Sequence, residues 1–534
     1  MRTTAILGLI LLAGFFLRSY NLDFPSIGYH NMIENEYLSI AQEMLNTQDF
    51  INRRVYFYNA FAENPIVKTY SEPPLISYQV IISWKLLGGN LWGPRLINIL
   101  FGLLSILIIY FIANLLFANV GLALYSAFLL AIMPLAVFFS RNLQPESPAF
   151  FFMLLANLFY LRFARNLKKY NLFLGSLCMS CAWLYRFNFI FGILPPLFCL
   201  PYKTLFKEKK EPFKCALAFF LPYLTLLLVI FLLSRLGQWD FNKAGGIKLD
   251  IFSLTYWKNY GNTILWYIKG ENYTPVYSIL ALLGILFALF KGSSLLNRYI
   301  IGWSLTAIFY GKVFSEQIYQ QSFAQKPFLV MVCICSAYAI WYISETVKKF
   351  FKKNLIIYFM ILTTAISMPF VYGSLSKMFA TVFFGEDVAG ESLKEFTGPS
   401  ERIFLFTYAQ GYAIARYAQR YVGWPANLQD FKEREEKNNI RYVCFYPAEF
   451  IYTLKTSNPE WFEYIQNNYH VKEVGLSEEM NKIFYLILER GTGSDPKTFL
   501  QSFSGKKQVR TIYKLFGTYI FFSTIRPDAE QKPG

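Results

Sequence analysis

The stretch GYHNMIENEYLSIAQEML, residues 28–45, places two glutamates beside one of the two histidines of the chain. Glu34 and Glu36 are two residues apart, and His30 precedes them. Apolar side chains recur at the spacing of one helical face, at Ile33, Tyr37, Ile40, Ala41 and Met44. We therefore expect an amphipathic helix with carboxylates in its first turn. Such a carboxylate is either a solvated group at a helix N-terminus or, if it faces a cavity, a general base.

Further charged and polar residues stand where apolar segments begin or end. They are Glu72, Lys85, Arg141, Glu146, Arg186, Gln317 and Tyr319. An arginine at the mouth of a membrane segment can bind an anion, and an ionisable group within a membrane suggests function. Simpler interpretations exist, because Arg141 and Glu146 can pair with each other and Lys85 can extend its ammonium group to the interface. Together these residues predict a cavity lined by acids, cations and aromatic rings.

The composition indicates a membrane protein. Of the 534 residues, 55% are hydrophobic and 19% aromatic, and the mean hydropathy is +0.32. Several stretches reach the roughly 20 apolar residues that a helix needs to cross a bilayer. The formal net charge of +17 fits a membrane protein with basic cytoplasmic loops, so we expect the lipid bilayer and no nucleic acid as a partner.

Apolar windows predict a mostly α, polytopic membrane protein with about eleven transmembrane helices. The windows cover residues 4–20, 94–117, 119–139, 147–163, 171–184, 187–202, 213–234, 275–291, 297–312, 327–347 and 354–373. The region 171–202 could instead be re-entrant. The densest basic clusters, RFARNLKKY, KTLFKEKKEPFK and KKFFKK, follow the fourth, sixth and tenth windows. Because basic loops face the cytoplasm, we expect a cytoplasmic N-terminus and place the candidate residues on the outer side.

The last part of the chain changes character. The segments ERIFLF, RYVCFY, KIFYLIL and YIFFSTI predict strands, and YAQGYAIARYAQRY and PEWFEYIQNNY predict amphipathic helices. This alternation is typical of a small α/β domain. We therefore expect two domains: a transmembrane domain at 1–373, with a large first outer loop at 21–93, and a soluble, extracytoplasmic α/β domain at 374–534.

The cysteines and histidines predict neither a disulfide framework nor a zinc site. Six of the seven cysteines lie in apolar segments, where they are expected to act as small hydrophobic residues. With two histidines and no Cys/His cluster, zinc ligands are lacking in the pattern. No cofactor is indicated, although a divalent cation bound by carboxylates is compatible with the acidic residues.

Several landmarks resemble the polyprenyl-phosphate-sugar-dependent glycosyltransferases of the C superfold, which include the protein O-mannosyltransferases and the lipid A aminoarabinose transferase (glycosyltransferase families 39 and 83). The acidic motif and helix of the first outer loop in that group correspond to IENEYLSIAQEML, and its PPL motif corresponds to EPPLISY. Later landmarks correspond in the same order to KLLG with PRLINILFGLLSILIIYFIANLLF, to FSRNLQPESPAFFF, to QIYQQSFAQKP and to RYVGW. The resemblance covers roughly residues 1–160 and 312–490.

The resemblance implies an enzyme that transfers one sugar, with inversion, from a polyprenyl-phosphate donor to an acceptor glycan, lipid or protein. The reaction would occur on the outer face of the bacterial cytoplasmic (inner) membrane. Glu36 or Glu34 would be the catalytic base, and Glu72 and Glu146 would position the acceptor or the sugar. The lipid phosphate would be bound by cations among Arg53, Arg54, Lys68, Lys85, Arg141, Arg186 and Lys326.

The sequence departs from the pattern of this group at two places. The usual Asp-Glu pair is absent, because its Asp corresponds to Ile33; this leaves Glu34 as the acid, or Glu36 after a shift of one residue. A subgroup with H-x-x-R-x-x-D aligns His30 with its histidine and Glu36 with its acid. The histidine that is common before the tenth span corresponds to Gln317.

A transporter or flippase of a lipid-linked saccharide is the competing hypothesis. Such a transporter is expected to show repeated halves and ionisable groups near the middle of the membrane. Here the sequence shows no internal repeat, and the ionisable residues gather at the outer ends of the windows. The altered acidic motif also permits a third hypothesis, a catalytically inactive member that acts as a scaffold.

Overall fold

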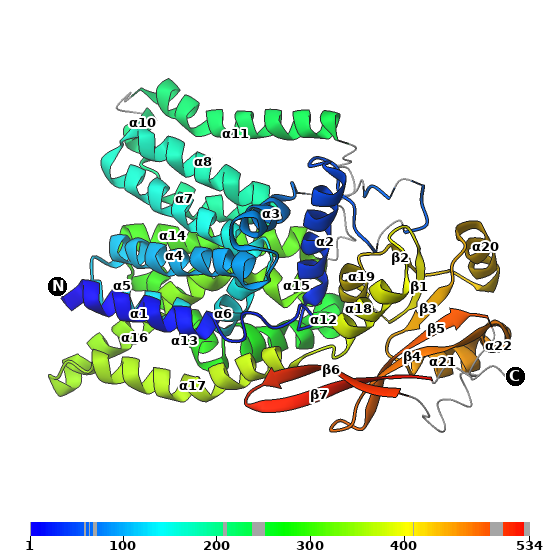
Figure 1. Cartoon of the computed structure of the whole chain (residues 1–534). Coiled ribbons are helices and arrows are strands. Elements are labelled where there is room, and N and C mark those ends of the chain that lie inside the picture. Colours follow the sequence, from blue (N-terminus) through cyan, green and yellow to red (C-terminus); the bar gives the residue numbers. More distant parts are fainter. Residues whose placement is uncertain are drawn as a thin grey trace, which may run out of the picture. The chain divides into compact units, whose positions relative to one another are not determined.

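The chain forms two compact units in the computed structural model, which describes residues 2–57, 60–63, 65–67, 72–206, 211–237, 251–408, 411–491 and 506–527. The helical unit comprises Met1–Phe24 and Thr69–Met378, and the sheet unit comprises Pro25–Lys68 and Phe379–Gly534. Their elements are labelled in Figure 1. Residues 25–68 therefore pack with the C-terminal part of the chain, whereas the expected division at residue 373 grouped them with the transmembrane helices. Lys68, a candidate cation, lies outside the described residues.

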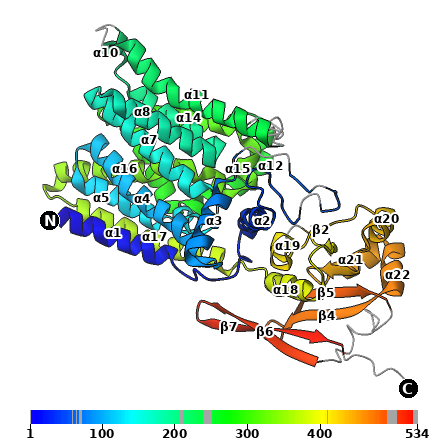
Figure 2. The same ribbon diagram turned by 45° about the horizontal axis from the view of Figure 1, so that its top comes forward.

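Each predicted apolar window is helical over most of its length. The helical unit contains α1 (Arg2–Arg18), α3 (Leu75–Leu87), α4 (Trp92–Phe117), α5 (Val120–Ile132), α6 (Pro134–Arg141), α7 (Glu146–Asn166), α8 (Lys169–Tyr185), η1 (Phe187–Ile193), α9 (Leu194–Cys199), α10 (Tyr202–Phe206), α11 (Pro212–Leu236), α12 (Leu254–Trp266), η3 (Tyr267–Asn272), α13 (Pro275–Lys291), α14 (Ser294–Val313), α15 (Ser315–Gln320), η4 (Ser322–Phe328), α16 (Leu329–Phe351) and α17 (Ile356–Ala380). Helix α7 packs against both α4 and α8, and these three run side by side in Figure 2.

Five stretches of the described residues are long and apolar enough to cross a membrane. They are α4, α7, α11, the continuous stretch Ser322–Phe351 and α17. Two bent pairs raise this number to seven if each pair is one span: α5 with α6, bent by 56°, and Leu254–Asn272 with α13, bent by 105°. The chain is thus a membrane protein of several apolar helices, and the expectation of about eleven spans stays a prediction.

The bend between α5 and α6 follows from Pro134 and is stabilised by Arg18. Proline has no N–H to donate to the carbonyl four residues earlier, which is that of Leu130. Arg18, fully buried at the end of α1, donates from Nη2 to the Leu130 carbonyl (3.2 Å) and from Nη1 to the Ala131 carbonyl (2.9 Å). The carbonyls at the broken helix end are therefore hydrogen-bonded. The bend directs α6 toward the connection that carries Glu146.

A seven-stranded mixed sheet organises the sheet unit, in the order β2-β1-β3-β5-β4-β7-β6. The strands are β1 (Ile403–Phe406), β2 (Val422–Gly423), β3 (Tyr442–Phe445), β4 (Tyr469–Ser477), β5 (Lys482–Arg490), β6 (Lys506–Leu515) and β7 (Thr518–Arg526), and the helices are α2 (Asn31–Thr47), α18 (Glu386–Phe396), α19 (Tyr412–Ala418), α20 (Leu428–Asn438), α21 (Phe450–Ser457) and α22 (Pro459–Asn468). Strand β1 is parallel to β2 and β3, and the remaining pairs are antiparallel.

The core of the sheet unit is rich in aromatic rings. Phe406 stacks on Phe445 with ring centroids 4.8 Å apart, and Phe404 stacks on Phe431 at 4.3 Å. Four strands, β1, β3, β5 and β7, lie where the sequence predicts them. Strands β4 and β6 have no counterpart in the prediction, because polar residues interrupt their apolar ones.

Two buried carboxyl groups begin α18. Asn31 of α2 donates from Nδ2 to Glu386 (2.6 Å), and the Tyr513 hydroxyl of β6 donates to Asp387. Burial raises the pKa of Glu386 well above its usual range and raises the pKa of Asp387 to about 6, although the bond from Tyr513 opposes the second shift. Glu386 and Asp387 thus join α18 to α2 and β6. Burial favours the protonated form of both carboxyl groups.

The contribution of Asp387 to the stability of the sheet unit should fall as the pH rises from about 4 to about 6. An unfolded aspartate loses its proton near pH 3.8, whereas folded Asp387 retains it to about pH 6, so rising pH favours the unfolded chain in this window. Asp387→Asn should reduce this loss by up to about 3 kcal/mol. Hydrogen exchange of the strand peptides in the full-length protein, corrected for intrinsic rates at each pH, measures the opening free energy. Glu436→Gln, at an exposed position of α20, is the matched control, and equal pH dependence in all three proteins contradicts the prediction.

Candidate functional site

Helix α2 begins at Asn31, and the residue before it, His30, has a left-handed backbone (φ 57°). Its buried side includes Glu34, Asn35, Leu38 and Ala41. The predicted apolar stripe is therefore rotated, because Ile33 and Tyr37 are only half-buried while polar residues are buried. The rotation has a tertiary cause: α2 packs against α19 of the same unit, whose side chains offer hydrogen bonds to the polar face.

Glu34 is a buried carboxylate and not a solvated one. It is 4% exposed, and Ser26 Oγ donates to its Oε2 at 2.5 Å. Neighbouring Asn35 donates to the Ser26 carbonyl (2.6 Å) and accepts from Arg416 Nε of α19 (2.7 Å). Glu36, by contrast, is half-buried. Of the two candidate bases, Glu36 is thus the more accessible, while Glu34 belongs to a hydrogen-bonded network.

His30 is held in its neutral form. Burial lowers the pKa of its imidazole to about 4, and its ring lies against Tyr29 with centroids 4.2 Å apart. At neutral pH the imidazole therefore adds no positive charge to the beginning of α2. A role for His30 is restricted to packing and hydrogen bonding, and phosphate binding by an imidazolium is not expected.

Three sequence-predicted residues meet in the helical unit, and we call Glu72, Glu146 and Arg186 the Arg186 cluster. Arg186 Nη1 lies 3.3 Å from Glu72 Oε1, and its Nε lies 3.2 Å from Glu146 Oε1. The side chains are 16%, 7% and 2% exposed for Arg186, Glu72 and Glu146. Glu72 precedes Pro73-Pro74, Glu146 begins α7, and Arg186 ends α8. Three helix ends are therefore joined by one guanidinium.

A second buried cation acts on the same cluster. Lys326 in η4 is 1% exposed and donates from Nζ to the Phe139 carbonyl of α6 at 3.3 Å. Glu146 interacts electrostatically with Lys326, with Arg186 and with Glu72. Lys326 thus adds a second buried positive charge that acts on Glu146, in a site largely withdrawn from water, where such interactions are strong.

Buried amides that sequence reasoning missed position the Arg186 cluster. Gln79 Nε2 donates to Asn98 Oδ1 (2.9 Å), and Asn98 Nδ2 donates to the carbonyls of Asn142 (2.5 Å) and Gln144 (3.2 Å). These carbonyls belong to the connection between α6 and α7, directly before Glu146. An asparagine inside the apolar window PRLINILF was the available signal, because a buried amide needs a partner.

The other predicted residues make different contacts. Arg141 ends α6 and donates to the Asn21 carbonyl, whereas Glu146 pairs with Arg186. Lys85 is exposed in the last turn of α3, about 15 Å along the helix from its first residue. Gln317 and Tyr319 are half-buried in α15, and the Tyr319 ring stacks on Tyr260 at 4.0 Å.

The Arg186 cluster does not suit a divalent cation. Its two carboxylates point at the Arg186 guanidinium, which supplies the charge that a bound metal would bring. In the part of the chain that the structure describes, no group of three or more His, Cys, Asp and Glu side chains is close enough to hold a metal ion.

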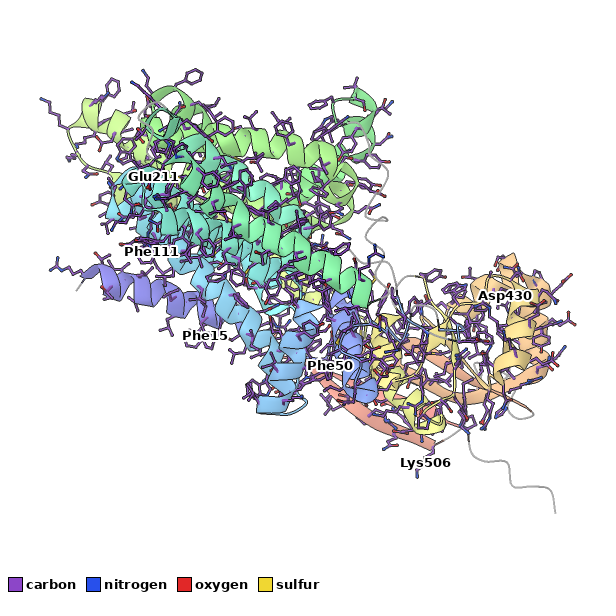
Figure 3. All side chains as sticks on the ribbon, turned by 90° about the horizontal axis from the view of Figure 1, so that it is seen from above. Phe15, Phe50, Phe111, Glu211, Asp430 and Lys506 are labelled. Carbon is purple, nitrogen blue, oxygen red and sulfur yellow. The ribbon has the colours of Figure 1, made fainter. Side chains whose placement is uncertain are left out.

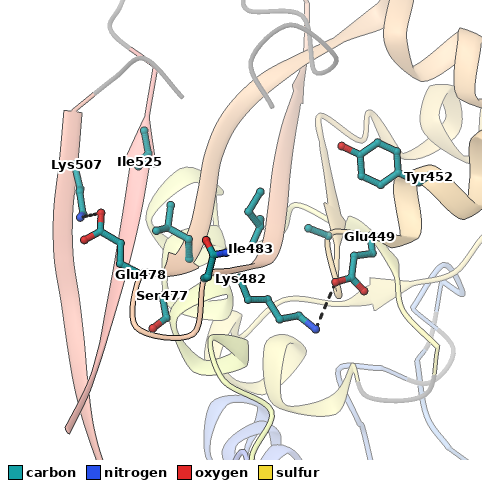
Figure 4. A pocket seen from close by; sticks show the side chains of 11 residues that line it. Glu449, Tyr452, Ser477, Glu478, Lys482, Ile483, Lys507 and Ile525 are labelled. Carbon is teal, nitrogen blue, oxygen red and sulfur yellow. Dashed lines mark hydrogen bonds and ion pairs between the residues drawn. The ribbon is translucent and has the colours of Figure 1, made fainter. Parts of the chain in front are cut away.

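The sheet unit has a separate groove of about 590 Å³ between α21 and strands β4–β7. Figure 4 shows its charged rim, where Lys482 pairs with Glu449 (3.4 Å) and Lys507 pairs with Glu478. The floor includes Ile483. Since no sequence-predicted site residue lines it and its charges pair with each other, we do not include it in the candidate site.

The fold and the Arg186 cluster define a polytopic membrane protein with a buried, charge-balanced site at its helix ends. Residues 71–239, which contain the whole cluster, match the family model described as Dolichyl-phosphate-mannose-protein mannosyltransferase. The chain is 25% identical over 231 residues to an uncharacterized protein of Aquifex aeolicus (strain VF5), which covers 43% of this chain and 42% of that protein. It is 28% identical over 194 residues to "Putative mannosyltransferase YycA" of Bacillus subtilis (strain 168), over 36% of this chain and 27% of that protein.

Two solved structures share the fold over nearly the whole chain. The oligosaccharyltransferase AglB of Archaeoglobus fulgidus, in complex with an inhibitory peptide and a dolichol-phosphate, matches with a TM-score of 0.52 and 12% identity, over 91% of this chain and 74% of AglB. ArnT of Cupriavidus metallidurans bound to undecaprenyl phosphate matches with a TM-score of 0.50 and 12% identity, over 92% of this chain and 99% of ArnT. The chain therefore shares the fold of these two membrane proteins, and residues 71–239 match a mannosyltransferase family model.

Removing the arginine of the cluster should destabilise the protein more than removing all three charges. Arg186→Met leaves Glu72 and Glu146 buried without their shared cation, at a cost of about 3–5 kcal/mol. The triple variant Arg186→Met/Glu72→Gln/Glu146→Gln should recover part of that loss, because no charge is left uncompensated.

Thermal unfolding of the purified proteins in detergent measures the order of stability of the wild type, Arg186→Met and the triple variant. Lys85→Met, which removes an exposed cation of α3, is the matched control and should change the midpoint little. A triple variant that is less stable than Arg186→Met would show that the ion pairs do not carry the effect.

Proposed function

We propose that this protein is an integral-membrane glycosyltransferase that transfers a sugar from a polyprenyl-phosphate donor to an acceptor, with inversion at the anomeric carbon. The reaction takes place at the outer face of the bacterial cytoplasmic membrane. In this orientation the N-terminus is cytoplasmic and the C-terminal domain is extracytoplasmic. The acceptor is a glycan, lipid or protein with a nucleophilic group.

The observation that supports the proposal most is the family match of residues 71–239, because this segment holds the complete Arg186 cluster. A lipid-linked donor suits such a protein, since the polyprenyl tail can stay in the bilayer while the phosphate and sugar reach charged helix ends. Of the two similar structures, AglB is in complex with a dolichol-phosphate and ArnT is bound to undecaprenyl phosphate. Their likeness to this chain supports the class of donor, and it leaves the sugar open.

The chemistry needs one base and one site for a leaving phosphate. The acceptor oxygen forms a bond to the anomeric carbon, its proton passes to a carboxylate, and the bond between the anomeric carbon and the phosphate oxygen breaks. We assign the base to Glu36, with Glu34 second, because Glu36 is half-buried whereas Ser26 already donates to Glu34. The proton on the glutamate then passes to water.

The leaving polyprenyl phosphate carries away the electron pair of the broken bond and needs cations. The two buried cations that interact electrostatically with Glu146 are Arg186 and Lys326. In our proposal Glu72 and Glu146 hold Arg186 in place and position the sugar or the acceptor. Arg141, Lys85, Arg53 and Arg54 are the further candidates for the phosphate.

Replacing Glu36 should slow transfer without abolishing donor binding. Glu36→Gln retains the shape of the side chain but cannot take a proton, so we expect a loss of about 10²–10⁴-fold in kcat with a small change in KM. Glu34→Gln should lose less. The measurement incubates the purified protein with radiolabelled polyprenyl-phosphate sugars and follows their consumption.

Glu63→Gln is the matched control, because Glu63 is an exposed acid of the same loop region. Full activity in both Glu36→Gln and Glu34→Gln would overturn the assignment of the base. A wild-type protein that moves an intact labelled donor across vesicles and consumes none would favour the flippase hypothesis instead.

A further inference from the structure

The β6–β7 hairpin has two faces of different character. Antiparallel partners share one face of a sheet and faces alternate along each strand. Ile512 is paired with Phe521, and Lys514 is paired with Tyr519, so these four side chains lie on one face. Tyr513 is paired with Ile520 on the other face. The hairpin register therefore separates two sets of residues.

One face of the hairpin is buried in the sheet unit. Tyr513 is 2% exposed and Phe522 is fully buried. The Tyr513 ring lies 5.2 Å from that of Phe384, and its hydroxyl donates to Asp387 of α18. These contacts fix the orientation of the hairpin, so the opposite face must point away from the domain core.

The opposite face exposes large apolar side chains. Val509, Ile512, Tyr519 and Phe521 are 52%, 50%, 54% and 43% exposed. Val509 shares this face because it is paired with Ser523, two residues beyond Phe521. Soluble domains rarely leave a contiguous apolar face of this kind on an edge strand, where it invites association. We call these four residues the exposed hairpin face.

All charged residues of the β6–β7 hairpin are basic. Residues 506–526 contain five basic side chains and no Asp or Glu. Arg510 and Arg526 pair with Glu395 of α18, and Lys507 pairs with Glu478. Lys506, which begins β6 (Figure 3), and Lys514 add further positive charge to the two ends of the strand. A basic surface with interleaved aromatic and aliphatic groups is complementary to an anionic lipid interface.

The chain also limits how far the hairpin can lie from a membrane helix. Phe384, against which Tyr513 packs, is four residues after Ala380, the last residue of α17. Four residues span at most roughly 14 Å. Helix α17 is one of the stretches apolar enough to cross a bilayer. The connection therefore limits how far Phe384, and the part of the hairpin that packs on it, can lie from the end of α17.

We infer that the exposed hairpin face binds the interfacial layer of the bilayer, with Tyr519 and Phe521 at headgroup depth and Lys514 on lipid phosphates. Aromatic side chains favour this layer, and lysine extends its ammonium group to the headgroups. Weak intrinsic affinity suffices, because the attached helices already hold the hairpin close to lipid and give it a high effective concentration. The inference concerns a lipid surface and does not depend on the proposed glycosyltransferase activity.

The test places an environment-sensitive label on the hairpin of the full-length protein in lipid nanodiscs. Ile512→Cys and Phe521→Cys are labelled with NBD, and nanodiscs contain phospholipid spin-labelled near the headgroup, with and without phosphatidylglycerol. Thr518→Cys is the matched control, because it is exposed but paired with Leu515 on the other face. Lys432→Cys on exposed α20 is a second control, and the unmutated chain reports labelling of its own cysteines.

We expect labels at 512 and 521 to be quenched at least two-fold more than those at 518 and 432, with a larger difference when phosphatidylglycerol is present. Equal quenching at all four positions would overturn the inference. Disulfide-linked dimers of Phe521→Cys without lipid quenching would also overturn it, because the face would then bind a second copy of the chain. Since both substitutions are at exposed positions, neither is expected to prevent folding, and the far-UV spectrum of each variant checks this.

Discussion

The bridge that Arg186 makes between Glu72 and Glu146 is the constraint on which the helical unit depends. Two buried carboxylates without a cation would destabilise any arrangement of α3, α7 and α8, whereas one guanidinium satisfies both at 3.3 and 3.2 Å. Arginine suits this position because its fork of donors can reach two acids at once. The helix ends that carry these residues are therefore held together, and the charged site exists only when all three segments have packed.

The supporting structure follows the same rule, that a buried polar group requires a partner. Pro134 breaks α5 and exposes carbonyls, and Arg18 donates to them. Asn98 donates to the carbonyls of Asn142 and Gln144, in the connection that leads to Glu146. In the sheet unit, Ser26 donates to Glu34, and Asn31 donates to Glu386. Apart from the contact between Ser26 and Glu34, these hydrogen bonds join segments that are far apart in the chain, so they depend on the tertiary fold.

Much of this organisation was predictable from the sequence. The apolar windows became helices, because a run of apolar residues has few other ways to satisfy its backbone in a membrane. Glu72, Glu146 and Arg186 were recognisable as charges at window ends. Their pairing was not, since Arg141 stands closer to Glu146 in sequence than Arg186 does. Similarly, the spacing of apolar residues in α2 predicted that Ile33 and Tyr37 would be buried. Packing on α19 buries Glu34 and Asn35 instead.

The sequence by itself determined the class of the protein, the location of its helices and four strands, and the residue types that could do chemistry. These properties depend on local composition and periodicity. The tertiary structure decided which charges meet, which glutamate of α2 is withdrawn from water, and that residues 25–68 pack with the C-terminal sheet. It also decided which face of the β6–β7 hairpin is exposed. These properties depend on contacts between distant segments, and a buried group's environment is set by its neighbours in space and not by those in sequence.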